Sequence, residues 1–151
     1  MLLRLSKIEE VDIITNISIS SFHSDYQVGL SPNDGPPGYD NIEWYRKMQS
    51  ESHLYSYIDE NNLVIGGAVL FLSNDTLYIG RIFISPIFHR NGFGIKLMED
   101  IENMFKSFKR IKLDTLKNNI RTNSLYKKLG YTLVESDGDF NIYIKDNINN
   151  S

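Results

Sequence analysis

Residues 77–108 read LYIG-RIFISPIFHR-NGFGIKLMED-IENMFKSF, and this stretch decides the expected fold. Its first part, residues 77–85, is rich in β-branched and aromatic side chains and predicts a strand. Pro86 has no amide hydrogen to donate, so strand pairing should end there. Apolar residues then recur at helical spacing from Ile95 to Phe108. The stretch therefore predicts a strand, a turn and a helix.

The turn between this strand and helix contains Gly92 and Gly94. Glycine lets the backbone turn tightly and approach a ligand closely. The first amides of a helix lack acceptors within it, and the positive end of its dipole lies there, so an anion such as phosphate is a suitable ligand. Taken alone, the turn fits a tight connection that binds nothing equally well. It lacks the Gly-Lys-Ser/Thr of a Walker loop, and no third glycine at Lys96 or Leu97 completes a dinucleotide fingerprint.

Composition limits the class of protein. The chain has 151 residues, of which 41% are hydrophobic and 23% charged, which suits one globular domain with a full core. The net charge is −3 and no Lys/Arg cluster stands out, which argues against nucleic acid as a partner. The acidic balance weakly favours a cationic or amine-bearing partner.

Several chemistries and locations are disfavoured by what the sequence lacks. There is no cysteine, which excludes disulfides, thiol nucleophiles and thiolate metal sites. The three histidines, His23, His53 and His89, share no metal-ligand spacing, so no metal is expected. The first residues do not form a signal peptide and no apolar run is long enough to span a membrane, so the expected location is the cytoplasm.

The other elements follow from periodicity and turn residues. The expected order is a strand at 2–5, a helix to about residue 20, a loop at 21–39, a helix from about 41, strands at 53–59, 63–72 and 77–85, a helix at 95–108, a strand at 110–115, a helix ending at 130, and strands at 131–135 and 140–145. This order predicts an α/β fold with a mixed, mostly antiparallel sheet and helices on both faces. We expect one domain over 1–146 and a frayed tail at 147–151.

Local signals refine these boundaries. Ser6 with Glu9, and Asp40 with Glu43, have the spacing of capping boxes at two helix starts. Gly66 and its neighbour Gly67 predict a bulge or a close backbone approach within a strand. The loop at 21–39 combines aromatic residues with Pro, Gly, Asn and Asp, and a loop of that length in a compact domain is often functional.

The central stretch and a second motif together resemble the GNAT acetyltransferase superfamily. The first motif runs from His89 to Gly94, with His89 where the superfamily usually has Gln or Arg. The second places Asn119 seven residues before Tyr126, which is followed by Lys-Lys-Leu-Gly-Tyr. The resemblance covers nearly the whole chain, is sharpest between Tyr78 and Tyr131, and implies a GNAT-like acyl-CoA N-acyltransferase fold.

The resemblance implies that the chain binds acetyl-CoA as co-substrate. The backbone of the central strand would pair with the pantetheine amides, and the turn would hold the pyrophosphate through backbone amides. The implied donor-site residues are Ile82, Phe83, Ile84, His89, Arg90, Asn91, Gly92, Phe93, Gly94, Ile95, Asn119 and Tyr126. Backbone donors would do most of this work, so the departure at His89 affects it little.

The resemblance also implies residues for the chemistry. The Ile84 amide would stabilise the oxyanion, which is typically worth about 10²–10³ in rate. Tyr126 would protonate the leaving thiolate, because a phenol pKa near ~10 lies above the ~8.5 of a thiol. Without the family context, Tyr126 is better explained as a core aromatic residue one turn before a helix end. With no cysteine, we expect direct attack by the amine in a ternary complex rather than an acetyl-enzyme.

The general base and the acceptor are less defined. Many superfamily members have Glu at the position of Gly80, so the commonest base is missing; His53, Asp25 and Glu51, acting through water, are the alternatives. The residues that could line the acceptor cleft are Phe22, Tyr26, Tyr39, Tyr78, Gly80 and Tyr143. Each of the aromatic residues could equally serve packing alone.

Other functions remain open from sequence. Gly80 also suits a non-catalytic acyl-CoA sensor or interaction module on the same fold, and a longer acyl-CoA could replace acetyl-CoA. A purely structural domain would bind no CoA at all. The expected acceptor is a small-molecule or peptide amine, and a homodimer is one expectation because dimers are common in the superfamily.

Overall fold

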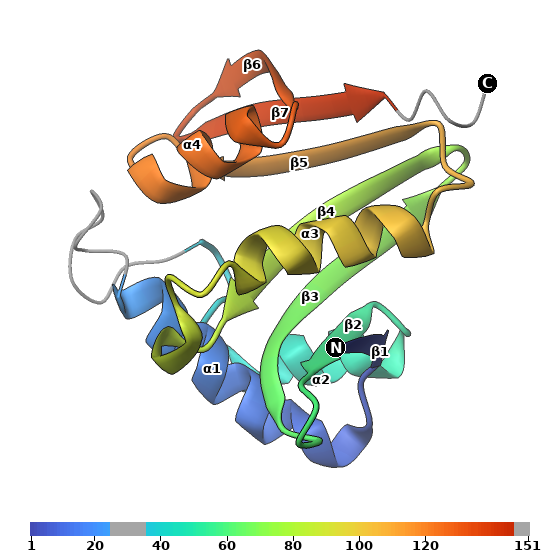
Figure 1. Cartoon of the computed structure of the whole chain (residues 1–151), viewed down its shortest axis with the longest axis vertical. Helices are drawn as coiled ribbons and strands as arrows, with labels where there is room; N and C mark the ends of the chain where they lie inside the picture. Colours follow the sequence, from blue (N-terminus) through green and yellow to red (C-terminus); the bar gives the residue numbers. More distant parts are fainter. Residues whose placement is uncertain (25–35, 147–151) are drawn as a thin grey trace.

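Within residues 1–24 and 36–146, the computed structural model has a seven-stranded mixed sheet in the order β1-β2-β3-β4-β5-β7-β6 (Figure 1). The strands are β1 (Leu2–Leu5), β2 (Leu54–Ile58), β3 (Val64–Ser73), β4 (Thr76–Ile84), β5 (Arg110–Leu116), β6 (Thr132–Asp137) and β7 (Phe140–Asp146). The helices are α1 (Val11–His23), α2 (Ile42–Ser50), α3 (Phe93–Met104) and α4 (Ile120–Lys128). The predicted order of elements and the α/β fold class are confirmed.

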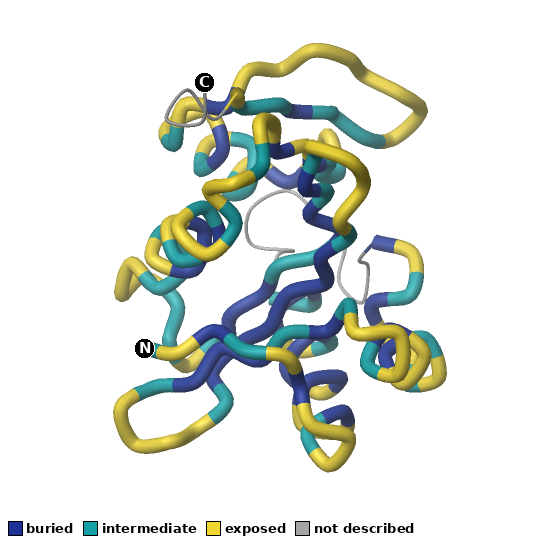
Figure 2. Tube along the Cα trace, turned by 90° about the vertical axis from the view of Figure 1, so that its right-hand side faces the viewer, coloured by how far each residue is buried: buried dark blue, intermediate teal, exposed yellow. Residues whose placement is uncertain are grey.

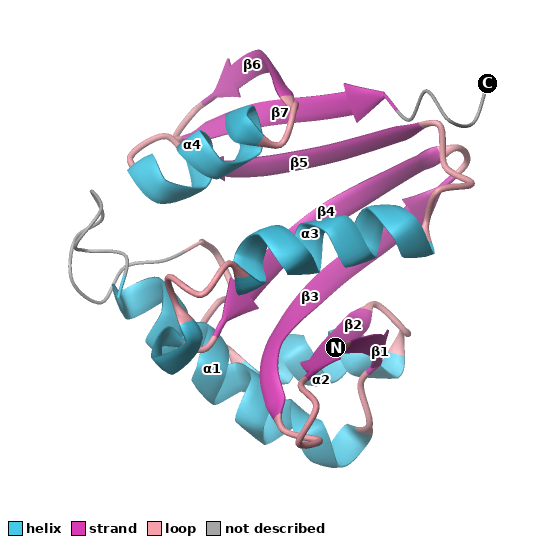
Figure 3. Ribbon diagram, viewed as in Figure 1, coloured by secondary structure: helices cyan, strands magenta, loops and turns pink. Residues whose placement is uncertain are grey.

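Helices cover both faces of the sheet, as predicted. On one face, Leu97, Met98 and Ile101 of α3 are fully buried in a cluster that also contains residues of β3, β4 and β5. Helices α1 and α2 pack against the opposite face, where Ile14 and Tyr45 are fully buried. Figure 3 shows α3 crossing in front of β3 and β4, and Figure 2 shows buried residues concentrated along the central strands.

Neither capping box forms at its predicted residues, and each N-cap lies one residue later than predicted. The first uses Lys7 and Glu10, with the Lys7 amide donating to Glu10 Oε1 at 2.8 Å, because the Ser6 hydroxyl is bonded to Ser56 Oγ at 2.7 Å. At α2 the N-cap is Asn41, whose side chain accepts from the amides of the second and third helical residues. Asn is as good a cap as Asp, so the pattern alone does not choose between neighbours.

Two other boundaries differ from the prediction. Helix α1 continues to His23, into the segment expected to be loop, because Ser21 and Phe22 are buried on its inner face. Helix α3 ends at Met104, and Phe105 and Phe108 beyond it still pack against the core. Two predicted segments lie outside the described residues: the part of the predicted loop at 25–35 and the predicted frayed tail at 147–151.

The close backbone approach predicted at Gly66 is confirmed. A Cβ on Gly66 would lie 2.4 Å from the Phe83 carbonyl oxygen of the neighbouring strand. A register shift lies beside it, at Ile65, where β3 pairs with β2. A second shift, which the sequence did not indicate, makes Gly80 the extra residue of β4 opposite β3.

The bulge at Gly80 coincides with the point where β4 and β5 separate. These strands run parallel and pair only from Thr76 to Ile79 on β4 and from Arg110 to Leu113 on β5. Beyond that point β4 stays paired with β3 and β5 stays paired with β7, so the two strand ends diverge (Figure 1). The sheet therefore opens in its middle, and no described residue pairs with the edge of β4 that faces β5 beyond Ile79.

Candidate active site

Two pockets lie at the opening between β4 and β5. The first, which we call the Asp114 pocket, holds about 400 Å³ including its open mouth. It is lined by Phe22, Pro36, Gly80, Arg81, Ile82, Asp114, Thr115, Leu116, Asn119, Thr122, Tyr126 and Phe140. The second, the Arg121 pocket, holds about 480 Å³ and is lined by Ser21, Phe22, Ile82, Phe83, Ile84, His89, Gly94, Leu97, Arg121, Thr122 and Leu125. The two pockets share Phe22, Ile82 and Thr122, so they are neighbouring compartments of one site.

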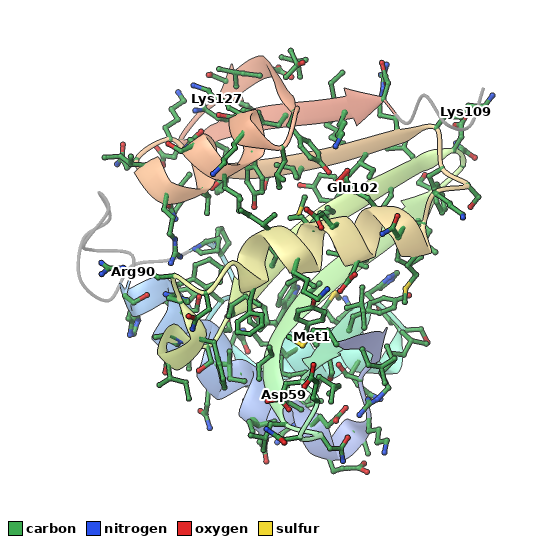
Figure 4. All side chains as sticks on the ribbon, viewed as in Figure 1. Met1, Asp59, Arg90, Glu102, Lys109 and Lys127 are labelled. Carbon is green, nitrogen blue, oxygen red and sulfur yellow. The ribbon has the colours of Figure 1, made fainter. Side chains whose placement is uncertain are left out.

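The predicted glycine turn lies at the outer end of the Arg121 pocket. Gly92 is the N-cap of α3 and has φ +76°, a conformation that glycine adopts without strain. Among the described residues, no atom lies within 4 Å of a Cβ placed on Gly92, and only Leu125 Cδ2 lies that close at Gly94. The first amides of α3 therefore border open space. Figure 4 shows Arg90 at this turn, where its side chain is exposed.

His89 is held by two hydrogen bonds that fix its tautomer. Nε2 lies 2.7 Å from the Ile84 carbonyl oxygen, so it carries the proton, and Nδ1 accepts from Arg121 Nη1 at 3.1 Å. Burial lowers the pKa of His89, which favours the neutral ring that the bond from Arg121 to Nδ1 requires. His89 thus ties the end of β4 to the first turn of α4.

Asn119 and Tyr126, the two residues of the second motif, both line the Asp114 pocket. The Asn119 side chain caps α4 by accepting from the Thr122 amide at 3.1 Å. Tyr126 is 4% exposed and packs against the rings of Tyr131 and Tyr143 at centroid distances of 6.0 and 5.8 Å. Tyr126 therefore packs in the hydrophobic core and also contributes to the lining of the Asp114 pocket.

The predicted acceptor residues are divided among different places. Phe22 lines both pockets and Gly80 lines the Asp114 pocket. Tyr78 donates to Asp114 Oδ2 at 2.7 Å, and burial together with this hydrogen bond raises its pKa to about 12. Tyr26 lies outside the described residues. The two remaining tyrosines are buried in the hydrophobic clusters on opposite faces of the sheet: Tyr39 and Tyr143.

Neither described candidate for the general base lines the Asp114 pocket or the Arg121 pocket. His53 Nδ1 lies 3.0 Å from the Leu70 carbonyl oxygen, and its ring packs on Phe71 at 4.6 Å. Glu51 is the exposed C-cap of α2. Asp25 lies outside the described residues.

Three charged residues of the pockets were missed by the sequence reasoning: Arg81, Asp114 and Arg121. Arg81 Nη2 donates to the Pro37 carbonyl oxygen at 2.6 Å, and its guanidinium carbon lies 5.7 Å from the centre of the Trp44 ring. Burial lowers the pKa of Arg81. The local sequence gives a signal at Arg81 alone, which interrupts the otherwise apolar run from Ile79 to Ile84, whereas Asp114 continues the polar alternation of Arg110 and Lys112 along β5.

Comparison with known proteins identifies the family. The family model described as "Acetyltransferase (GNAT) family" matches residues 18–131. The chain belongs to the GNAT acetyltransferase family. Comparison with curated proteins gave no match.

Solved structures of other GNAT proteins share the fold. The PaiA N-acetyltransferase of Thermoplasma acidophilum, in complex with coenzyme A, aligns over 96% of this chain and 98% of its own with a TM-score of 0.80 and 17% identity. A GNAT acetyltransferase of Streptococcus agalactiae aligns over 96% and 94% with a TM-score of 0.82 and 19% identity. The spermidine N-acetyltransferase of Vibrio cholerae, in complex with CoA and spermine, aligns over 97% and 95% with a TM-score of 0.71 and 18% identity.

In residues 1–24 and 36–146, no three or more His, Asp or Glu residues gather as a metal site would require. None of the described helices is both long and apolar enough to cross a membrane.

Proposed function

We propose that the chain transfers the acetyl group of acetyl-CoA to a primary amine by direct attack within a ternary complex. The observation that carries the proposal is the opening between β4 and β5, where the Asp114 and Arg121 pockets meet at Ile82. A donor entering from one pocket and an acceptor entering from the other would meet beside Tyr126. Membership of the GNAT family supports the same chemistry.

The residues present suit an acyl-CoA donor. The edge of β4 between Gly80 and Ile84 faces the opening without a strand partner, so its amides and carbonyls can pair with an amide-bearing chain such as pantetheine. The open space above Gly92 admits a phosphate close to the first amides of α3. Arg121 lines the adjoining pocket, where its guanidinium can form bidentate hydrogen bonds with the pyrophosphate.

The proposed chemistry uses the end of β4 and the end of α4. Acetyl-CoA supplies an acetyl group that is activated as a thioester. The Ile84 amide stabilises the oxyanion, and the hydrogen bond from His89 to the Ile84 carbonyl holds that peptide segment in place. Tyr126, in the Asp114 pocket, protonates the leaving thiolate. No nucleophilic cysteine is available, so the amine attacks the thioester directly.

The test is release of CoA thiol by the purified protein with acetyl-CoA and a panel of primary amines. Tyr126→Phe should lower kcat by roughly 10²–10⁴ and weaken acetyl-CoA binding far less. Tyr55→Phe is the matched control, because Tyr55 lies on β2 and lines neither pocket. Equal kcat for Tyr126→Phe and the control would remove Tyr126 from the mechanism. Acetyl label retained on the protein after removal of acetyl-CoA would refute direct transfer.

One observation favours a second function. Gly80 occupies the position where many GNAT enzymes have a glutamate base, which suits a non-catalytic acyl-CoA-binding module. Such a module predicts acetyl-CoA binding without turnover of any amine. If the protein released CoA thiol with any acceptor faster than the Tyr126→Phe variant does, the non-catalytic function would be excluded.

A further inference from the structure

The Asp114 pocket contains two opposite charges that do not neutralise each other. Arg81 on β4 and Asp114 on β5 both line it. Among the described residues, no ion pair joins the two side chains, although the charge of Asp114 acts on Arg81 through space. Two unpaired opposite charges in one small pocket can each take a ligand group of the opposite sign.

Arg81 is arranged to receive an anion. A guanidinium has five N–H donors. In this structure Nη1 donates to the Gly80 carbonyl oxygen and Nη2 to the Pro37 carbonyl oxygen, while Nε is buried without an acceptor among the described residues. Contact with the Trp44 ring further fixes the side chain. A half-buried cation with spare donors is costly, so a bound carboxylate would be favoured there.

Asp114 is arranged to receive a cation on the other side of the opening. Tyr78 donates to its Oδ2 at 2.7 Å, which orients the carboxylate. An ionised carboxylate has about four acceptor sites, so this one hydrogen bond leaves room for an ammonium group. Asp114 is also beside Gly80, where the usual glutamate base is missing, so it can take over the removal of a proton from the amine.

We propose, on the basis of the acetyltransferase function above, that the acceptor is an α-amino acid whose ammonium group binds Asp114 and whose carboxylate binds Arg81. The apolar part of the lining comes from Phe22, Ile82, Leu116 and Phe140, so the amino-acid side chain is apolar. A polyamine such as spermidine has no carboxylate for Arg81 and would bring a second ammonium group toward a guanidinium. The pocket therefore disfavours polyamines.

The transfer balances with these groups. The ammonium loses one proton to Asp114, which passes it to solvent. The neutral nitrogen then attacks the thioester carbon, so that a C–N bond forms and the C–S bond breaks. The thiolate takes a proton from Tyr126, and the acetylated nitrogen returns its second proton to Tyr126. In sum, one proton ends on the CoA thiol and one in solvent.

The experiment compares kcat/KM for leucine, methionine and phenylalanine with that for the amide and the decarboxylated amine of each, with spermidine alongside. At least one amino acid should exceed its two counterparts by roughly 10- to 150-fold, the value of a hydrogen bond to a charged group. Arg81→Met should abolish this preference and Arg81→Lys should reduce it. Arg110→Met, which makes the same charge change in an exposed ion pair with Asp146, should keep it.

The preference is a ratio measured within each variant, so partial loss of folded protein does not alter it. The acceptor assignment would be wrong if the amide or the decarboxylated amine were acetylated as well as the amino acid. It would also be wrong if spermidine were preferred over all three amino acids. Either result would leave the acetyltransferase function standing. Acetyl-CoA binding without acetylation of any of the three amino acids would overturn it too. Absence of both acetyl-CoA binding and turnover would instead refute the proposed function itself.

Discussion

Gly66→Ala should distort the proposed donor site, although Gly66 itself lines neither pocket. A Cβ at Gly66 would lie 2.4 Å from the Phe83 carbonyl oxygen and 2.8 Å from Ile84 Cδ1, whereas ordinary contacts begin at about 3.4 Å. The obstacle is the backbone of β4, so β3 and β4 must separate by about 1 Å at Ile84, the proposed oxyanion donor. Overpacking of this kind typically costs about 1–3 kcal/mol in the free energy of unfolding.

Gly80→Ala is the matched control for this prediction. Its Cβ would lie 2.8 Å from Phe71 Cε2, at the end of a side chain that can move, and 3.4 Å from the nearest backbone atom, the Val69 carbonyl oxygen. Urea unfolding should therefore show a loss for Gly66→Ala that exceeds the loss for Gly80→Ala by at least about 1 kcal/mol. Gly66→Ala should also raise the Kd for acetyl-CoA. Equal unfolding free energies for the two variants would refute the reasoning.

Three further predictions concern single side chains. Arg121→Met should raise the Kd for CoA roughly tenfold by titration calorimetry, because a hydrogen bond to a charged group is lost; an unchanged Kd would exclude Arg121 from the donor site. His89 has a lowered pKa, so the neutral ring is fully present above pH ~6.5 and is lost as pH falls, and acetyl-CoA affinity should weaken from pH 7 to 5. His89→Gln, which can donate and accept without titrating, should remove most of that pH dependence, and its persistence would contradict the assignment. The hydrogen bond from Arg4 lowers the pKa of Glu10 from 4.5 to about 2, so its stabilisation is complete above pH 4.5 and is lost as pH falls toward 2. Glu10→Gln should therefore lower the unfolding free energy at pH 7 by about 2 kcal/mol after solvent screening, and flatten its pH dependence in that window, whereas an unchanged acid transition would refute it.

The sequence predicts those parts of the site that depend on local rules. The strand at 77–85 follows from its β-branched and aromatic content, and the turn follows from Pro86 and Gly92. The Asn119 side chain caps α4 through a hydrogen bond within its own turn, which is again a local feature. Each of these features is decided by residues within a few positions along the chain.

The rest of the site depends on which strands become neighbours. Arg81 and Asp114 share a pocket only because β4 pairs with β5 as far as Ile79 and then diverges at the Gly80 bulge. No pattern along either strand reports that pairing. Arg121 likewise gains its place through the hydrogen bond to His89, 32 residues away in the chain.

Thermal unfolding with and without acetyl-CoA tests the central claim most directly. Binding to the folded protein alone at about 100 times Kd should add ~2.7 kcal/mol, which raises Tm by about 5–10 °C in a domain of this size. NADH and ATP at the same concentration serve as controls and should raise Tm less. A rise with acetyl-CoA that is absent from Gly92→Val, where a side chain would obstruct the phosphate approach, is the predicted result. No rise with acetyl-CoA, or an equal rise with all three ligands, would contradict the assignment of the opening between β4 and β5 as a donor site.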